Sequence, residues 1–187
     1  MIDQSTIGLL AGIIGFLSFI PYILETLNRK ISPNRATWII WAVLGIIIAV
    51  SYYSAGARSS AWVPAAYAVG IVIMALLTLK YGEGGWTKLD IVCLVGAGLG
   101  LVIWALTNNP VLPLYLTIAI DAIGAVPTIK KAYERPETES RTSWLMFLVA
   151  NTLNLFAINE WTLVVASYPV YVFVLSIVMS WLLARKK

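Results

Sequence analysis

The 187-residue chain contains no histidine and a single cysteine, Cys93. The lack of histidine excludes imidazole-based metal sites, catalytic triads and imidazole proton switches. One cysteine cannot form a disulfide within the chain. Charge is also scarce, because Asp, Glu, Lys and Arg make up 12% of the residues, about half the share found in soluble domains. The sequence has no phosphate-binding loop, metal-ligand spacing or nucleophile–base pair, so it predicts no cofactor and argues against an enzyme.

Apolar residues account for 60% of the chain, and they recur in runs of about 20 residues, which is long enough to cross a bilayer. A helix that is apolar all round is a membrane span or the core of a large protein, and this chain is too short for the second. We therefore predict an all-α, multi-pass integral membrane protein with the lipid bilayer as a partner. In a bacterium it would lie in the cytoplasmic (inner) membrane.

Seven transmembrane helices are predicted, at Thr6–Leu27, Ala36–Ser54, Ala61–Leu79, Leu89–Leu106, Val111–Ile129, Ser143–Ile158 and Trp161–Leu183. With these spans, all but one of the 13 Lys and Arg residues fall on the same side, and Arg58 alone lies on the other. The positive-inside rule then places the N-terminus outside and the C-terminus in the cytoplasm. Because the charges sit at the ends of apolar runs, the net charge of +4 does not indicate nucleic acid as a partner. The first residues, MIDQST, are acidic rather than basic, so we expect the first run to be a retained span and not a cleaved signal peptide.

An internal repeat relates Gly15–Trp41 to Asp121–Phe147, with a shift of about 106 positions. The shift places Pro21 on Pro127 and Trp38 on Trp144. It predicts a 3+1+3 arrangement: a first triple-helix bundle at 1–80, a linker helix at 81–109 and a second bundle at 110–187. A single linker span makes the two triplets cross the membrane in the same direction, as parallel repeats.

This arrangement resembles the PQ-loop superfamily, which includes the SWEET sugar transporters, their half-size bacterial relatives and lysosomal amino-acid exporters of the cystinosin type. The namesake Pro-Gln pairs are Pro21-Tyr22 and Pro127-Thr128 here, so the prolines match and the glutamines do not. The resemblance implies that the triplets rock about hinges at Pro21 and Pro127 and expose a central site to each side in turn. It also implies proton coupling through a membrane aspartate near the position of Asp121.

Asp121 lies near the middle of the fifth predicted span. A carboxylate at that depth costs about 2.5–3.5 kcal/mol to insert and usually faces a bundle interior on an ion or substrate path. Asp121 is therefore a candidate proton carrier or a ligand for a cationic substrate group. The alternative is a structural aspartate bonded to a neighbouring Ser, Tyr or Asn.

Asn151 and Asn154 share one helical face, because they are three residues apart. Their carboxamides fit either a polar substrate pocket or hydrogen bonds between helices. The second repeat thus holds most of the deep polarity, since the matching residues of the first are Gly45 and Ile48.

Tyr67, Tyr171 and Trp41 are predicted to line the same substrate site, since an aromatic face with a polar tip suits a sugar or a flat ligand. Five other aromatic residues are expected in the interfacial belts, namely Trp38, Tyr52, Tyr53, Trp144 and Tyr168. At the basic end, Glu25 is a candidate partner for Lys131 in a gate. The acidic residues of the second basic loop are interpreted as a solvated face; they are Glu134, Glu137 and Glu139.

These observations favour a small-solute transporter that works by alternating access on a sugar, amino acid or similar polar metabolite, with protons as a candidate coupling ion. The alternative is a SWEET-like seven-helix receptor or binding protein that captures a ligand without moving it. A homo-oligomer is compatible with the sequence. The sequence does not specify the substrate.

Overall fold

The computed structural model describes residues 3–107 and 109–185, except for nine side chains within residues 89–105. Within this range the chain is helical and contains no β-strand, which confirms the predicted all-α class. The elements in chain order are α1 (Gln4–Leu17), α2 (Phe19–Leu27), α3 (Arg35–Ser54), η1 (Ser59–Ala61), α4 (Trp62–Tyr81), α5 (Lys88–Thr107), α6 (Val111–Glu134), η2 (Pro136–Thr138), α7 (Arg141–Phe156) and α8 (Leu163–Ala184).

Five helical stretches of the described residues are long and apolar enough to cross a membrane, which fits an integral membrane protein. They are Gln4–Leu27, Arg35–Ser54, Ser59–Tyr81, Val111–Glu134 and Leu163–Ala184. The predicted count of seven is not reproduced by this criterion. The helix at the sixth predicted span, α7, has only 16 residues, and α5 contains side chains that lie outside the described set.

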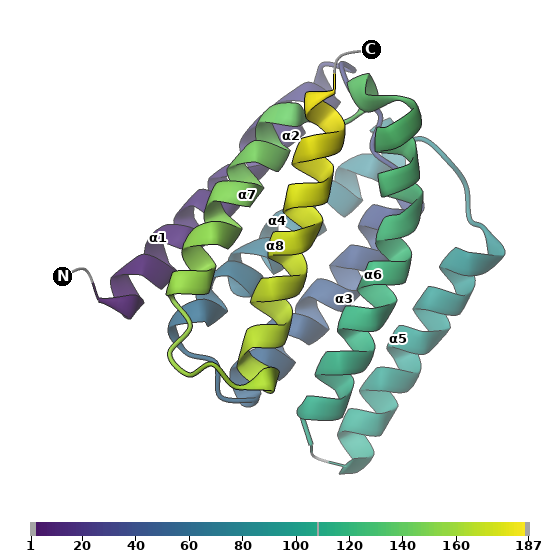
Figure 1. The fold of residues 1–187 in the computed structure, drawn as a ribbon. Coiled ribbons are helices and arrows are strands. Elements are labelled where there is room, and N and C mark those ends of the chain that lie inside the picture. The colour runs from purple at the N-terminus through teal and green to yellow at the C-terminus, as the bar shows by residue number, and fades with distance from the viewer. Residues whose placement is uncertain (1–2, 108, 186–187) are drawn as a thin grey trace.

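The helices pack into two groups that meet face to face (Figure 1). In the first group α4 contacts both α1 and α3, and in the second group α8 contacts both α6 and α7. The groups touch each other through α1 with α7 and through α3 with α6. The remaining long helix, α5, packs on the outside against α6 and α3. The central space between the groups is therefore bounded by helices from both halves of the chain.

The two prolines predicted as hinges have different surroundings. Pro21 lies near the start of α2, and the helix is interrupted at Ser18, just before it. Proline has no N–H to donate to the carbonyl four residues earlier, here that of Leu17, and its ring crowds that carbonyl. The Ser18 hydroxyl donates to the Ile14 carbonyl at 2.7 Å beside the break. Pro127, by contrast, lies inside the uninterrupted α6. The hinge role of both prolines stays a prediction.

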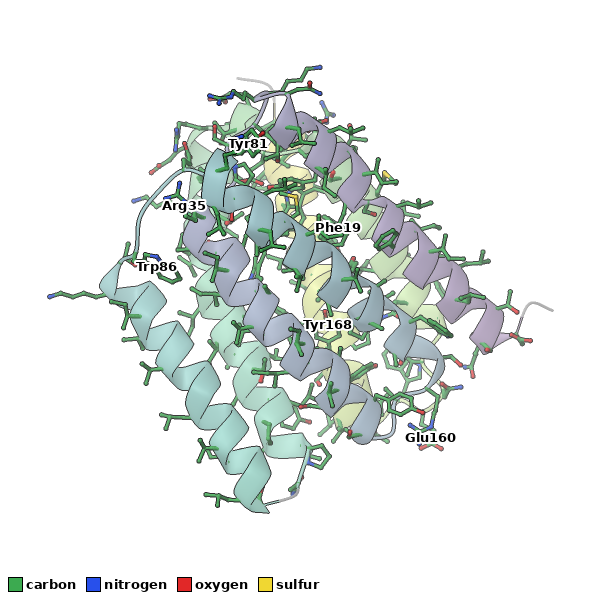
Figure 2. The ribbon with its side chains drawn as sticks, turned by 180° about the vertical axis from the view of Figure 1, so that it is seen from behind. Phe19, Arg35, Tyr81, Trp86, Glu160 and Tyr168 are labelled. Carbon is green, nitrogen blue, oxygen red and sulfur yellow. The ribbon has the colours of Figure 1, made fainter. Side chains whose placement is uncertain are left out.

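The outer surface of the bundle is apolar. Large side chains such as Leu76, Ile91 and Leu163 are more than half exposed, whereas charged residues gather at the helix ends, as the labelled Arg35 and Glu160 show at opposite ends of Figure 2. A soluble protein rarely exposes so continuous an apolar surface. This distribution is what a lipid-facing helical bundle requires.

Close packing at the start of α1 depends on small residues. A Cβ atom added to Gly8 would lie 2.0 Å from the carbonyl oxygen of Ser59, and one added to Gly12 would lie 2.9 Å from the Cβ atom of Trp62. The Ser59 contact involves backbone, which cannot rotate away. In α5, by contrast, a Cβ atom on Gly98 meets nothing within 4 Å among the described atoms.

We expect Gly8→Ala to destabilise the protein, because a methyl group forced against the Ser59 backbone costs about 1–3 kcal/mol in a packed interior. The matched control Gly98→Ala is expected to be neutral or stabilising by up to about 1 kcal/mol, since alanine is the better helix former. Thermal unfolding of the purified protein in detergent measures both. Equal midpoints for the two variants would contradict the close approach of α1 to η1.

Candidate functional site

A cavity lies between the two helix groups and receives side chains from α2, α3, α4, α6, α7 and α8. Its volume is about 60 Å³, which leaves room for a handful of water molecules at roughly 10–15 Å³ each. The described residues that line it are Phe19, Trp38, Trp41, Tyr67, Ile71, Asp121, Trp144, Phe147, Asn151, Tyr168, Val172 and Leu175. Four of the predicted site residues are thereby brought together: Trp41, Tyr67, Asp121 and Asn151.

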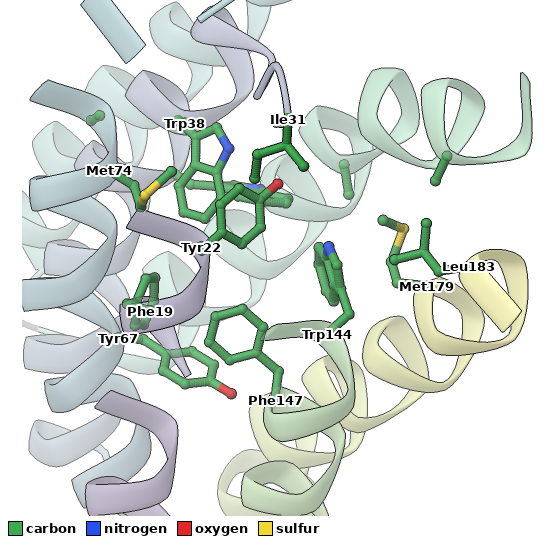
Figure 3. Packing of buried hydrophobic residues seen from close by; sticks show 14 of the residues in the cluster. Phe19, Tyr22, Ile31, Trp38, Tyr67, Met74, Trp144, Phe147, Met179 and Leu183 are labelled. Carbon is green, nitrogen blue, oxygen red and sulfur yellow. The ribbon is translucent and has the colours of Figure 1, made fainter. Parts of the chain in front are cut away.

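Edge-to-face aromatic contacts form the wall of this cavity, and several of them join the two helix groups (Figure 3). The ring of Phe147 on α7 lies 4.9 Å from the ring of Phe19 on α2 and 5.3 Å from that of Tyr67 on α4, measured between centroids. On the α3 side, the rings of Trp38 and Trp41 are 5.3 Å apart. Such pairs stabilise beyond their buried area, by about 0.5–1.5 kcal/mol each.

The prediction that Trp38 and Trp144 are interfacial anchors is wrong, because they are only 2% and 5% exposed and line the cavity. Their place near the starts of α3 and α7 gives their depth in the membrane, but not the helix face they occupy. A signal for the face was present in the repeat. Trp38 with Trp41, and Trp144 with Phe147, are aromatic pairs three residues apart at matching positions, and such pairs share one side of a helix.

Asp121 is 9% exposed and projects from α6 into the cavity. Its Oδ2 atom accepts a hydrogen bond from the hydroxyl of Tyr171 on α8. Its Oδ1 atom has no hydrogen-bond partner among the described residues. Tyr171, predicted to bind substrate directly, does not line the cavity; it fixes one oxygen of the carboxylate and leaves the other without a described partner.

The two asparagines predicted to share a pocket have different environments. Asn151 lines the cavity, and its carboxamide is already engaged: Oδ1 accepts from the Tyr67 hydroxyl at 3.0 Å, and Nδ2 donates to the Val172 carbonyl at 3.2 Å and to Ser176 Oγ at 3.3 Å. It connects α7 to α4 and α8. Asn154 is fully buried away from the cavity, and neither of its side-chain polar atoms has a hydrogen-bond partner in the described part of the chain.

At the end of the bundle that carries most of the Lys and Arg residues, a buried polar cluster adjoins the cavity through Trp144. Lys131 Nζ lies 2.6 Å from Glu139 Oε1 and donates to the Ser32 carbonyl at 2.5 Å. The Glu139 carboxylate also accepts from the Tyr22 hydroxyl and from Trp144 Nε1. We call these five residues the basic-end closure. Tyr22 and Ser32 belong to the first half of the chain, so the closure holds the two halves together.

The basic-end closure corrects two sequence predictions. Glu139 was expected on a solvated face with Glu134 and Glu137, but it is buried and only the other two are exposed. Lys131 pairs with Glu139 and, at 3.9 Å, with Glu83, in place of the expected Glu25. These partners come from loops, and the helical repeat gives no information about how a loop folds back over a helix end.

A second closure lies at the opposite end of the cavity. The Tyr52 hydroxyl donates to the Val165 carbonyl at 2.7 Å and lies 2.8 Å from Ser60 Oγ. The Tyr52 and Tyr168 rings pack 5.7 Å apart. These four residues, the far-end closure, join α3 to α8 across the two halves. Tyr52 and Tyr168 are therefore buried, and not interfacial as predicted. Tyr53 is 58% exposed, as expected for a belt residue.

No protein-family model, curated protein or solved structure matches the chain significantly. The resemblance to the PQ-loop superfamily therefore stays a prediction based on the repeat and its prolines. The site is one carboxylate in an aromatic cavity, with a cluster of contacts between the two halves next to each end.

The buried pair of the basic-end closure predicts an asymmetry between neighbouring lysines. Lys131→Met leaves Glu139 buried without its cation, which costs about 3–5 kcal/mol. Lys130 pairs with Glu134 on the surface, where its side chain is 72% exposed, so Lys130→Met should cost less than about 1 kcal/mol. Thermal unfolding in detergent compares the two. If both variants unfold at the same temperature, the Lys131–Glu139 pair does not carry the closure.

Proposed function

We propose that this protein is a small-solute transporter that works by alternating access, with the central cavity as its substrate site. The observation that carries the proposal is the pair of closures. Each contains one residue that lines the cavity, Trp144 in one and Tyr168 in the other, and each is made of contacts between the two halves of the chain. Moving one half against the other can therefore open one end while the other stays shut. In this interpretation the structure represents an occluded state.

The pattern of helix contacts supports a 3+1+3 arrangement of parallel triplets. The repeat pairs α1 and α2 with α6, α3 with α7, and α4 with α8. When each helix is replaced by its counterpart, the contact of α1 with α7 becomes a contact of α6 with α3, which the structure also contains. The same exchange turns the contacts inside the first group into those inside the second, and leaves α5 without a counterpart. We propose accordingly that α5 and α7 also cross the bilayer, giving seven spans with the basic end in the cytoplasm.

The short helix α2 is the proposed moving element. It begins just after the break at Ser18 and carries both Phe19, which lines the cavity, and Tyr22, which bonds Glu139 in the basic-end closure. A swing of α2 about Ser18 and Pro21 would withdraw Tyr22 from Glu139 and separate the Phe19 ring from that of Phe147. One hinge would thus open the cytoplasmic end and loosen the cavity wall together.

Asp121 is the proposed coupling residue. A carboxylate in an apolar cavity is stable when it holds a proton or faces a cation, and only one of its oxygens is engaged by Tyr171. Loading and unloading of a proton at this group in the two open states would couple proton movement to that of the solute.

Flux through reconstituted liposomes tests the function. We expect uptake of at least one compound from a set of radiolabelled glucose, alanine and phenethylamine, and a change in its rate when a pH gradient is imposed. Asp121→Asn should remove the response to the gradient, because the amide cannot carry the proton. Glu160→Gln, at an exposed carboxylate outside the cavity, is the matched control and should transport as the unaltered protein does.

Two outcomes contradict parts of this proposal separately. Binding of a ligand without flux under any gradient would favour the receptor of the same architecture, since a receptor needs only one opening to its site. Transport by Asp121→Asn that responds to the pH gradient as before would leave alternating access in place and remove the coupling role of Asp121.

A further inference from the structure

The charge of the cavity is unbalanced. Among its described lining residues Asp121 is the one acidic side chain, and none is basic. Lys131 is a buried cation, but it is held by Glu139 and the Ser32 carbonyl in the basic-end closure and does not line the cavity. An ionised carboxylate in such surroundings requires a positive partner. A positively charged ligand can be this partner.

Seven of the twelve described lining residues are aromatic, three of them tryptophans: Phe19, Trp38, Trp41, Tyr67, Trp144, Phe147 and Tyr168. Aromatic rings attract a cation electrostatically through their faces, with tryptophan the most effective. The same rings provide apolar contact for the body of an organic ligand. A cavity that combines such walls with one carboxylate suits a positively charged head on an apolar body.

Few polar groups remain for a neutral polyol. The Asn151 carboxamide already accepts one hydrogen bond and donates two within the protein, and Asn154 does not reach the cavity. The groups that remain are Asp121 Oδ1, the Tyr168 hydroxyl and the indole N–H groups of Trp38 and Trp41, both of which are buried with no acceptor among the described residues. A sugar would leave several hydroxyl groups unpaired, at about 1–3 kcal/mol for each buried group.

An amino acid fits no better, because its carboxylate would enter a cavity that already holds Asp121 and has no described basic lining residue to receive it. Like charges brought together in a poorly solvated site repel strongly. The unpaired indole N–H groups of Trp38 and Trp41 can donate to a neutral acceptor on the ligand, such as a hydroxyl, ether or carbonyl oxygen.

We propose that the cavity selects an organic monocation: a protonated amine with an apolar or aromatic body and no carboxylate, held by Asp121 as its counter-ion. The proposal rests on the proposed function only in taking this cavity as the substrate site. It removes sugars and amino acids from the solutes expected from the sequence, because the lining residues disfavour both.

Equilibrium binding to the purified full-length protein in detergent tests this directly, with tryptophan fluorescence as the readout and four probes of related shape. Phenethylamine carries the ammonium, 2-phenylethanol replaces it with a neutral hydroxyl, phenylalanine adds a carboxylate, and glucose is a neutral polyol. We expect phenethylamine to bind at least about 30-fold more tightly than the other three, because removing one partner of a buried charge pair weakens binding by at least about this factor.

Asp121→Asn should lower phenethylamine affinity to the level of 2-phenylethanol and leave the affinity for 2-phenylethanol unchanged, which shows that the variant is folded. Glu160→Gln should change neither. Absence of phenethylamine binding, equal or tighter binding of any other probe, or a preference for the amine that survives Asp121→Asn would overturn the proposal. Amine binding without flux would support the cation site and refute transport. Glucose flux without amine binding would support transport and refute the cation site.

Discussion

Burial of charge in an apolar helical bundle is the constraint on which this structure depends. Lys131 and Glu139 are both removed from water, and they pair with each other. They are also held by polar groups of the first half, the Ser32 carbonyl and the Tyr22 hydroxyl, and Glu139 accepts from the Trp144 indole N–H of the second half. Because an unpaired buried charge is so costly, these contacts must all form or all be replaced together. Under the proposed function, this all-or-none dependence is the property that a gate at the basic end needs.

The same constraint applies at the centre, where the two halves have complementary compositions. Gly15 in the first half matches Asp121 in the second, and its missing side chain leaves room for the Tyr67 ring, which a Cβ atom would approach to 2.9 Å. Tyr67 in turn bonds Asn151, the residue that matches Gly45. The first half thus contributes small residues and four of the seven rings at the cavity, and the second contributes the other three rings and the polar groups Asp121 and Asn151.

Much of this could be predicted from the sequence, because apolar runs and helix ends are local properties. The predicted start of the second span, Ala36, differs by one residue from that of α3, and Asp121, Tyr67, Trp41 and Asn151 do meet at one cavity. The errors concern which side of a helix a residue faces and what a loop covers. Nothing near Glu139 in the sequence indicates Tyr22, its hydrogen-bond partner 117 positions away. Asn154 was misplaced for a related reason: a shared helical face is broad enough for Asn151 to line the cavity while Asn154 packs beyond it.

The central claim is that one cavity is reached from both sides of the membrane in turn. Ile71 lines that cavity, so a cysteine at this position, in a Cys93→Ser background, reports its exposure. The most direct measurement is its rate of labelling by a membrane-impermeant thiol reagent applied to either face of oriented vesicles. The account predicts labelling from each face, with the rate from the cytoplasmic face raised by Lys131→Met and unchanged by Lys130→Met. Labelling from one face only, in every variant, would contradict it.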